Sequence, residues 1–522
     1  MPESKRITVD PVTRIEGHLK IDVEIENGVV KDAWSSGTMA RGIEILLKGK
    51  DPRDASYVTS RICGVCYSVH QLCSAYALDD AFGAKVPTGG TLLRNLVMGA
   101  EYIYDHVLHF YHLTALDYLD IMAIAKYNGK DKELNAVKDK IVGLVKSNDT
   151  YPLTPRYEPD EFCVNDPDVV IGAVKHYLDA LSMQAKARNM GAIFGGRQPH
   201  YQSIVAGGIT QLPDLNQVLK FKTMLDEQAK FVNDVYFPDV IAFGTGPLLP
   251  LATGGVGGGH YNYLSYGALQ VKPPRKDLLF PAGVITDMDP ANIQVRKFDP
   301  AKITESVKHA WYESSKPLHP SVGETRFDLD KEDAYTFVKA PRYDGYSMEV
   351  GPLARLLVAK DPTLLDLVKQ GVKPGAVARH ACRAIETKMV VDACYKWIDQ
   401  LIAEMTKPGF KIHDSAHWEI PDDGEGVGFY EPPRGALGHW IKIKDKKIEN
   451  YQAIVPTTWN ASPRCEQEVR GQYEESLIGV PVPDPDNPIN VVRVIRSFDP
   501  CLACAIHLID PQTNEIKKYI IE

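Results

Sequence analysis

Two short stretches decide how this chain must fold: Cys63-Gly64-Val65-Cys66 near one end and Cys501-Leu502-Ala503-Cys504 near the other. Most of the 522-residue chain lies between them, so only folding can bring the two pairs into one site. Four thiolates around one centre select a soft or borderline metal: zinc, the iron of an iron–sulfur cluster, or nickel. The rest of the sequence has to distinguish these metals.

The composition is that of a large globular protein. A length of 522 residues exceeds one simple core, which predicts two to four subdomains. Hydrophobic residues make up 44% and charged residues 24%, which are ordinary values. No apolar run approaches the roughly 20 residues that span a bilayer, and the polar segment 1–14 predicts no secretory signal. The net charge of −9, without a basic stripe that carries aromatics, argues against nucleic acid as a partner.

The apolar pattern predicts a β-hairpin first and long helices after it. Residues 7–32 alternate and contain Asn27-Gly28, a favourable hairpin turn, and we expect 14–18 in or just before the first strand. Residues 51–84 have a helical pattern that opens at Asp51-Pro52, which would place the first cysteine pair at a helix start or in a helical turn. Longer apolar-periodic segments predict helices at 94–122, 168–194, 215–236 and 374–405.

The remaining segments predict irregular structure and short strands. Residues 253–299 are rich in glycine and proline. A hairpin is expected over 440–454 with its turn near Asp445, and 491–498 is strand-like and leads into the second cysteine pair. Together these elements predict an α+β fold, predominantly α, with a long-helix bundle core and small peripheral β-sheets. We divide it into a β-rich segment, a helical core with the first cysteine pair, an irregular β region, and a helical and β region that ends in the second pair: 1–50, 51–250, 251–360 and 361–507.

Several kinds of site could use two cysteine pairs. Structural zinc is the commonest use of this spacing, but zinc normally joins a short local module, whereas here the loop would be most of the protein. A redox disulfide needs only one pair, and a four-thiolate iron–sulfur cluster remains open. The chain has nine cysteines, and the five outside the pairs show no ligand spacing, so we interpret them mostly as buried apolar residues.

The residues around the pairs form motifs that occur together in one family. Arg14–His18 (RIEGH), Arg61–Cys66 (RICGVC) with His70, and Asp499–His507 (DPCLACAIH) have the order and spacing of the signature of nickel–iron hydrogenase large subunits. Further stretches agree: 105–117 (DHVLHFYHLTALD), 340–355 (APRYDGYSMEVGPLAR), 432–437 (PPRGAL) and 455–463 (VPTTWNASP). The chain therefore resembles the large, catalytic subunit of that family over nearly its whole length, and most closely the membrane-linked uptake type. The related quinone-reductase subunit of respiratory complex I lacks both cysteine pairs, which disfavours it.

The resemblance implies a nickel held by all four thiolates. Cys63 and Cys501 would be terminal ligands, and Cys66 and Cys504 would bridge the nickel to an iron that carries carbon monoxide and cyanide. The implied reaction is the reversible heterolytic cleavage of dihydrogen, in which a Lewis acid polarises the molecule while a base takes the proton. Cys501 is the implied first base.

Two charged residues are implied to work beside the metals. Glu16 would relay the proton away from Cys501. From its position alone, Glu16 would instead be a strand-face carboxylate paired with Arg14. Arg434, with Pro433 before it, would lie over the open side of the metals, where its planar fork suits a fixed role that lysine would not fill.

Further residues are implied to support this centre. Asp117 and Asp499 match carboxylates that orient the arginine, and Thr457 matches a position that hydrogen-bonds a cyanide, although it could be an ordinary strand hydroxyl. His70 would hydrogen-bond a bridging sulfur. Glu44 and His507 match a structural magnesium site, in which a histidine is an unusual ligand. Three histidines recur at every third position, which drifts off one helix face, so we expect packing and supporting roles for them: His106, His109 and His112.

The resemblance also implies partners. The last residues, 508–522, are either a terminal hairpin or a maturation peptide that an endopeptidase removes after His507. The chain has no spare cysteine set to carry electrons away, so it needs a small subunit with iron–sulfur clusters. Export on that subunit's signal would place the enzyme on the periplasmic side of the membrane, attached only through partner subunits; a cytoplasmic enzyme fits equally well. The non-enzymatic alternative is a structural subunit of a redox complex joined by zinc or a cluster.

Overall fold

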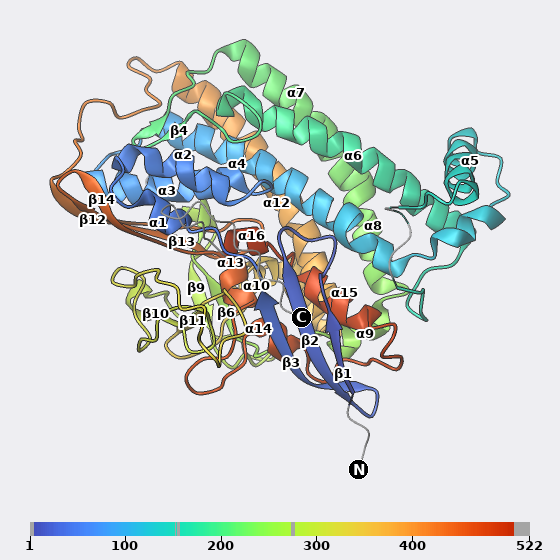
Figure 1. Cartoon of the computed structure of the whole chain (residues 1–522). Coiled ribbons are helices and arrows are strands. Elements are labelled where there is room, and N and C mark those ends of the chain that lie inside the picture. The colour runs from blue at the N-terminus through green and yellow to red at the C-terminus, as the bar shows by residue number, and fades with distance from the viewer. Residues whose placement is uncertain (1–4, 152, 154–156, 273–276, 506–522) are drawn as a thin grey trace.

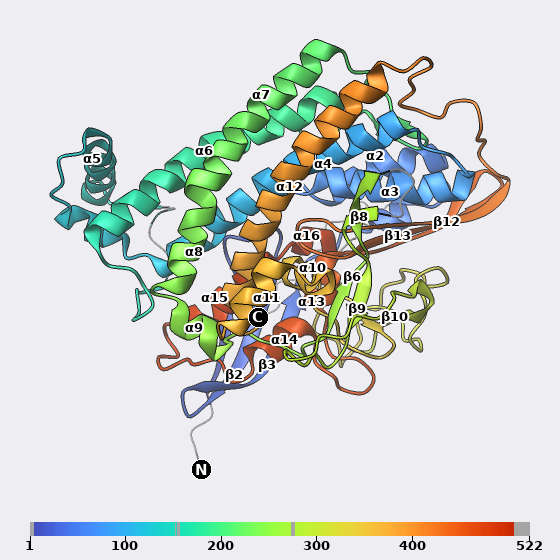
Figure 2. The same ribbon diagram turned by 180° about the vertical axis from the view of Figure 1, so that it is seen from behind.

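The structure, a computed structural model, describes residues 5–151, 153, 157–272 and 277–505. Long helices lie alongside one another and form the body of the molecule (Figures 1 and 2). These are α4 (Thr88–Leu108), α6 (Pro167–Gly195), α7 (Leu215–Phe231) and α12 (Ala376–Met405). Helix α4 contacts α6 and α12, and α7 contacts the same two helices. The predicted long-helix bundle is confirmed.

The strands form small antiparallel sheets at the edge of the bundle. One sheet has the order β1 (Lys5–Val9), β2 (Leu19–Glu26) and β3 (Val29–Gly37), with the predicted turn at Asn27-Gly28 between β2 and β3. Another joins β12 (Asp423–Tyr430), β13 (Leu437–Lys444) and β14 (Lys447–Ile454), with its predicted turn at Asp445. The α+β fold, predominantly α, is therefore confirmed. The division of the chain at 50, 250 and 360 stays a prediction.

The other elements are shorter. The helices are α1 (Ile43–Leu47), α2 (Ala55–Thr59), α3 (Tyr67–Phe82), α5 (Lys132–Lys146), α8 (Phe237–Thr245), α9 (Leu249–Gly254), α10 (Pro352–Ala359), α11 (Pro362–Lys369), α13 (Pro456–Asn460), α14 (Gln472–Leu477), α15 (Ile489–Ser497) and α16 (Leu502–Ala505). The paired strands are β4 (Ile204–Val205) with β5 (Gly208–Ile209), β6 (Tyr263–Ser265) with β9 (Gly283–Ile285), β7 (Ala268–Lys272) with β8 (Asp277–Phe280), and β10 (Ile303–Ser306) with β11 (Ala340–Tyr343).

The first cysteine pair lies at a break between helices. Helix α2 ends at Thr59, and the 3₁₀ turn that follows it ends at Ile62. Cys63 is extended with φ −136° and ψ 145°, and Cys66 is the N-cap of α3. The break confirms the expected position at a helix start. It leaves the backbone N–H groups of this turn available to the cysteine sulfurs, because helix N-terminal donors have no partner within the helix.

The segment before the second cysteine pair was predicted wrongly. Residues 489–497 form helix α15, whereas the pattern at 491–498 predicts a strand. Arg493 and Arg496, one helical turn apart, are both buried and reach Asp160 and Asp117. A strand would point these two side chains to opposite faces, so the buried ion pairs favour the helix over the β-propensity of the valines.

The predicted helix at 94–122 changes its geometry part of the way along. Helix α4 ends at Leu108, a π-helical turn follows over His109–Thr114, and a 3₁₀ turn follows over Ala115–Tyr118. A π turn is a feature of functional sites that apolar periodicity cannot reveal. The π turn rotates the residues after Leu108 relative to helix α4, so they do not share the helix face that a continuous α-helix would give them. Within the described residues, no helix is long and apolar enough to span a membrane.

Candidate metal centre

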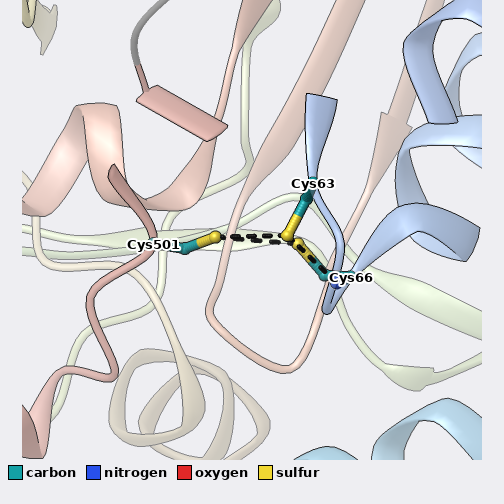
Figure 3. A group of neighbouring side chains, drawn as sticks. All are labelled: Cys63, Cys66 and Cys501. Atoms are coloured by element: carbon teal, nitrogen blue, oxygen red, sulfur yellow. Dashed lines mark hydrogen bonds between the residues drawn. The ribbon is translucent and has the colours of Figure 1, made fainter. Parts of the chain in front are cut away.

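Three cysteine sulfurs from opposite ends of the chain meet in the interior (Figure 3). The Cys63 Sγ lies 3.4 Å and the Cys66 Sγ lies 4.0 Å from the Cys501 Sγ, and the three sulfurs lie within 4.8 Å of one another. All three residues are at most 3% exposed. Cys504 lies in α16, but its side chain is outside the described part of the chain. The convergence of the two cysteine pairs is therefore confirmed for three of the four thiols.

The surroundings of Cys63 favour a metal-bound thiolate. The backbone N–H groups of Val65 and Cys66 donate to its Sγ at 3.2 and 3.1 Å. Such donors stabilise negative charge on sulfur, and a cluster of buried thiolates is stable only when a cation compensates it. This donor set of thiolates suits a soft or borderline metal such as nickel, so the residues present fit the predicted centre.

A backbone pairing brings Cys501 to the first pair. The Glu16 N–H donates to the Pro500 carbonyl at 3.2 Å, and the Leu502 N–H donates to the Glu16 carbonyl at 2.7 Å. Gly17 has φ +83°, and a Cβ there would lie 2.3 Å from the backbone nitrogen of Ala503. Only glycine allows the two segments to approach this closely.

Arg41 joins the two halves of the site, and sequence reasoning missed it. Its Nη2 donates to the Ala503 carbonyl at 2.6 Å and also to the Ile62 carbonyl. One guanidinium therefore holds the residue before Cys63 beside the helix that follows Cys501. Arg41 stands in none of the quoted motifs, so no sequence signal pointed to it.

Glu16 lies beside the sulfurs and does not pair with Arg14. Burial, followed by the negative charge of Cys63, raises the pKa of Glu16, while Arg434 and Arg41 act in the opposite direction. Arg14 donates instead to Asp117. The interpretation of Glu16 as a partner of Arg14 is therefore wrong.

Arg434 is held by two carboxylates, of which the sequence identified one. Its Nη1 donates to Asp105 Oδ2 at 2.8 Å, and its Nη2 lies 3.0 Å from Asp499 Oδ1. Burial opposes its charge, but Asp105, Asp499 and the thiols of Cys501 and Cys66 raise the pKa of Arg434. The guanidinium therefore stays charged beside the sulfurs.

The expected contact of Asp117 with Arg434 is wrong. Asp117 accepts from Arg496 Nη1 at 2.7 and 2.8 Å and from Arg14, and these arginines hold its pKa below the usual range although burial acts to raise it. The π-helical turn after α4 separates Asp117 from the face that carries Asp105. Asp105 opens the quoted stretch 105–117, so the motif contained the correct carboxylate at its other end.

Thr457 and His70 both lie near the sulfurs. The Cys501 N–H donates to Thr457 Oγ1 at 3.0 Å, and the hydroxyl keeps its own proton for a further acceptor. Thr457 lies in α13, so it is not a strand hydroxyl. The His70 Nδ1 lies 3.2 Å from the His439 Nε2, and burial lowers the pKa of His70 to about 4, which keeps it neutral. The hydrogen bond of His70 to a sulfur stays a prediction.

The expected supporting roles of the three histidines agree with their contacts. His106 Nε2 lies 3.2 Å from Glu386, His109 Nε2 lies 2.7 Å from the Arg496 carbonyl, and His112 Nε2 lies 3.0 Å from the Tyr177 carbonyl. Within the described residues, none of these histidines belongs to a group of three or more candidate metal ligands.

Glu44 is buried in a polar cluster. Its Oε1 accepts from the Ala453 N–H at 2.9 Å, and its Oε2 accepts from the Thr325 hydroxyl. His507 and the segment 508–522 lie outside the described residues. The magnesium site at Glu44 and His507 and the maturation peptide therefore stay predictions.

Comparison with known proteins identifies the family. A family model described as nickel-dependent hydrogenase matches residues 41–507, and one described as HoxL-like matches residues 6–35. The periplasmic [NiFeSe] hydrogenase large subunit of Desulfomicrobium baculatum is 40% identical over 98% of this chain and 96% of its own length. The uptake hydrogenase large subunit of Bradyrhizobium diazoefficiens is 35% identical over 98% of this chain and 97% of its own.

The solved structures agree with the sequence relatives. The H2-activated [NiFeSe]-hydrogenase of Dm. baculatum superposes with a TM-score of 0.84 at 40% identity, over 97% of this chain and 100% of that one. The motifs, the meeting of the cysteine sulfurs and the full-length similarity lead to one conclusion. The chain belongs to the nickel-dependent hydrogenase family, as a large, catalytic subunit.

Proposed function

We propose that Cys63, Cys66, Cys501 and Cys504 hold the nickel–iron centre of this hydrogenase and that the chain cleaves dihydrogen reversibly into protons and electrons. The meeting of three buried sulfurs within 4.8 Å carries this assignment. When bound, the centre supplies a Lewis acid that polarises dihydrogen and takes up its two electrons. Cys66 and Cys504 would bridge nickel to the iron, whose other ligands would be carbon monoxide and cyanide.

The chain's own residues would move the proton. The Cys501 thiolate accepts it, and Glu16, on the backbone segment paired with Cys501, carries it away. The raised pKa of Glu16 supports this role, because a carboxyl that titrates closer to neutral pH both accepts and releases protons readily. Asp117 has no part in this path, because it is fully occupied by Arg496 and Arg14.

Arg434 and Thr457 would bind the ligands of the iron and the substrate side of the centre. Arg434 keeps its charge, and Asp105 and Asp499 fix its plane from two directions. The Thr457 hydroxyl accepts from the Cys501 N–H, and its own O–H would be free to hydrogen-bond a cyanide ligand of the iron. The selenium named in the Desulfomicrobium relative is not carried over, because all four ligand positions of this chain are cysteine.

The electrons need a partner. Within the described residues, the one group of three or more candidate metal ligands is Cys63, Cys66 and Cys501. A small subunit with iron–sulfur clusters would therefore carry the electrons away. Its signal would export the complex to the periplasmic side of the membrane, to which other partner subunits attach it; the cytoplasmic alternative fits this chain equally well.

Maturation would complete the site. The family model ends at His507, which supports removal of 508–522 by an endopeptidase. Glu44 and His507 would then hold a structural magnesium.

Metal analysis of the chain purified with its partner tests the proposal. We expect about one nickel per chain and little zinc. About one zinc per chain without nickel would instead support the structural, non-enzymatic alternative. The isolated large subunit should not reduce an acceptor with dihydrogen, and activity at native rates without a partner would refute the need for a small subunit.

A further inference from the structure

A single buried arginine holds the backbone that leads into Arg434. Arg355 lies in α10, is 0% exposed, and uses all five of its N–H donors inside the protein. Its Nε and Nη2 donate to the two Glu386 oxygens at 2.7 and 2.8 Å, and its Nη1 donates to Glu431 Oε2 at 2.9 Å. The other two donors reach the carbonyls of Pro432 at 2.6 Å and Pro433 at 2.9 Å.

Those two carbonyls belong to the residues immediately before Arg434. Neither proline has an N–H, and the turn's own backbone hydrogen bond runs from the Gly435 N–H to the Pro432 carbonyl at 2.9 Å. Arg383 also approaches the Pro433 carbonyl, but at 3.4 Å, which is a weaker contact. Arg355 therefore donates to both carbonyls, and gives the shorter of the two side-chain contacts to Pro433.

The backbone of α10 confirms how closely the two segments fit. Gly435, directly after Arg434, has φ +131°, and a Cβ there would lie 2.6 Å from the nitrogen of Gly351, the N-cap of α10. The helix that carries Arg355 thus packs directly against both sides of Arg434. A small shift of α10 would move the arginine.

The charges of this cluster are costly to bury, which argues for a purpose other than stability. Arg355, Glu386 and Glu431 are all 0% exposed. Buried ion pairs are often no more stable than apolar packing of the same volume, because both charges lose their hydration. Burial raises the pKa of Glu431 to about 7, so one of the two carboxyls loses part of its charge. The cluster instead fixes the orientation of the Arg355 guanidinium toward the carbonyls of Pro432 and Pro433.

We propose that Arg355 is a positioning residue that sets where the Arg434 guanidinium lies over the thiols. This inference rests on the proposed role of Arg434 at the nickel–iron centre. Arg355 touches neither the sulfurs nor the substrate, and acts through the carbonyls of Pro432 and Pro433. Lysine could not replace it, because an ammonium has three donors and lacks the planar fork that serves Glu386 and both carbonyls.

The experiment is a double-mutant cycle in the complete enzyme with its partner. Arg355→Lys, Arg434→Lys and the double variant are compared for dihydrogen turnover per bound nickel. We expect Arg355→Lys to lower turnover about tenfold or more, and to add less than about twofold in the Arg434→Lys background. Losses that multiply in the double variant would overturn the inference, because Arg355 would then act independently of Arg434.

Arg94 provides a matched control. It is also a buried arginine, pairs with Asp79, and donates to two backbone carbonyls, those of Gly208 and Val205, away from the thiols. Arg94→Lys should lower the midpoint of thermal unfolding as Arg355→Lys does, without changing turnover per nickel. An equal loss of turnover in both variants would reduce the role of Arg355 to stability.

A crystal structure of each variant gives a readout that does not depend on activity. In Arg355→Lys the contact between Arg434 Nη1 and Asp105 should be lost, whereas Arg94→Lys should keep it at the 2.8 Å of the wild type. If Arg434 does not move in Arg355→Lys, the inference is overturned, whether or not the protein holds nickel. The structural result therefore tests the inference separately from the proposed function. If Arg355→Lys does not fold, Glu431→Gln removes the charge of the carboxyl that accepts from Arg355 and from the Tyr266 N–H, with almost no change of volume, and should displace Arg434 less.

Discussion

Glu16 and Cys501 lie side by side on two backbone segments that pair as a parallel β-bridge, although one belongs to the N-terminal loop and the other to the C-terminal motif. The hydrogen bonds from the Glu16 N–H and to the Glu16 carbonyl fix the spacing of the segments. The carboxyl that we assign to proton relay is therefore placed by main-chain contacts and not by its own side chain. This allows the side chain to be changed without loss of the site.

Glu16→Gln should remove the proton path and leave the centre intact. An amide cannot exchange a proton at neutral pH, so we expect dihydrogen oxidation to fall by about 10² to 10⁴. Nickel per chain should stay at the wild-type value, because the backbone pairing is retained. The same change at Glu26, at the end of β2, is the control and should have no effect; loss of nickel in Glu16→Gln would assign it a structural role.

Gly17→Ala should prevent assembly of the metal centre. The new Cβ would overlap the backbone nitrogen of Ala503, and the Cys501 segment would have to move. We expect nickel per chain to fall below about a tenth of the wild-type value, as the fourfold ligand set is no longer brought together. Gly28→Ala is a matched control: Gly28 has a similar φ of +75°, but its nearest atom would lie 3.9 Å away. Equal nickel loss in both variants would show that φ strain, and not the clash, is responsible.

Asp117→Asn should destabilise the protein and spare the chemistry. The change leaves the buried Arg496 and the half-buried Arg14 beside a neutral amide, which costs about 3 kcal/mol or more of folding free energy. The midpoint of thermal unfolding should fall by several degrees, while turnover per nickel stays within about twofold. Asp105→Asn provides the contrast, because it frees Arg434 and should lower turnover per nickel; a larger loss of turnover in Asp117→Asn would restore the original assignment.

Glu101 makes a contribution to the free energy of unfolding that declines as pH rises. It is 0% exposed, Tyr104 donates to its Oε1, and burial and then Asp105 raise its pKa. The folded chain thus keeps a proton that the unfolded chain releases above about pH 4.5, and folding stability is lost as pH rises from there through the raised pKa. In Glu101→Gln this contribution is absent. Its thermal midpoint relative to wild type should rise between pH 5 and pH 8; a constant difference would mean that Glu101 is ionised in the folded state.

The sequence predicted the parts of this fold that depend on local pattern or on motif. Apolar periodicity located α6 and α12 to within a few residues, and the turn residues located both hairpins. The motifs identified Cys63, Cys66 and Cys501 as neighbours. These signals are either repeated over many residues or specific to a family, so they do not depend on distant contacts.

The sequence predictions that were wrong or incomplete have one physical cause. Helix α15 is fixed by ion pairs to Asp117 and Asp160, residues more than three hundred positions away, and no local propensity contains that information. Asp105 and not Asp117 holds Arg434 because a π-helical turn intervenes, and Arg41 joins two carbonyls that only the folded chain brings together. Each error is a long-range contact that overrides a short-range pattern.

The pairing of Glu16 with the Cys501 segment also sets a time at which the site can form. During synthesis the loop around Glu16 leaves the ribosome more than four hundred residues before Asp499 to Ala503. Until then the growing chain offers a metal only Cys63 and Cys66, a two-thiol site with little selectivity among divalent ions. Assembly of the complete ligand set therefore requires synthesis past Cys504, and a chain interrupted between Cys66 and Asp499 carries only the first cysteine pair.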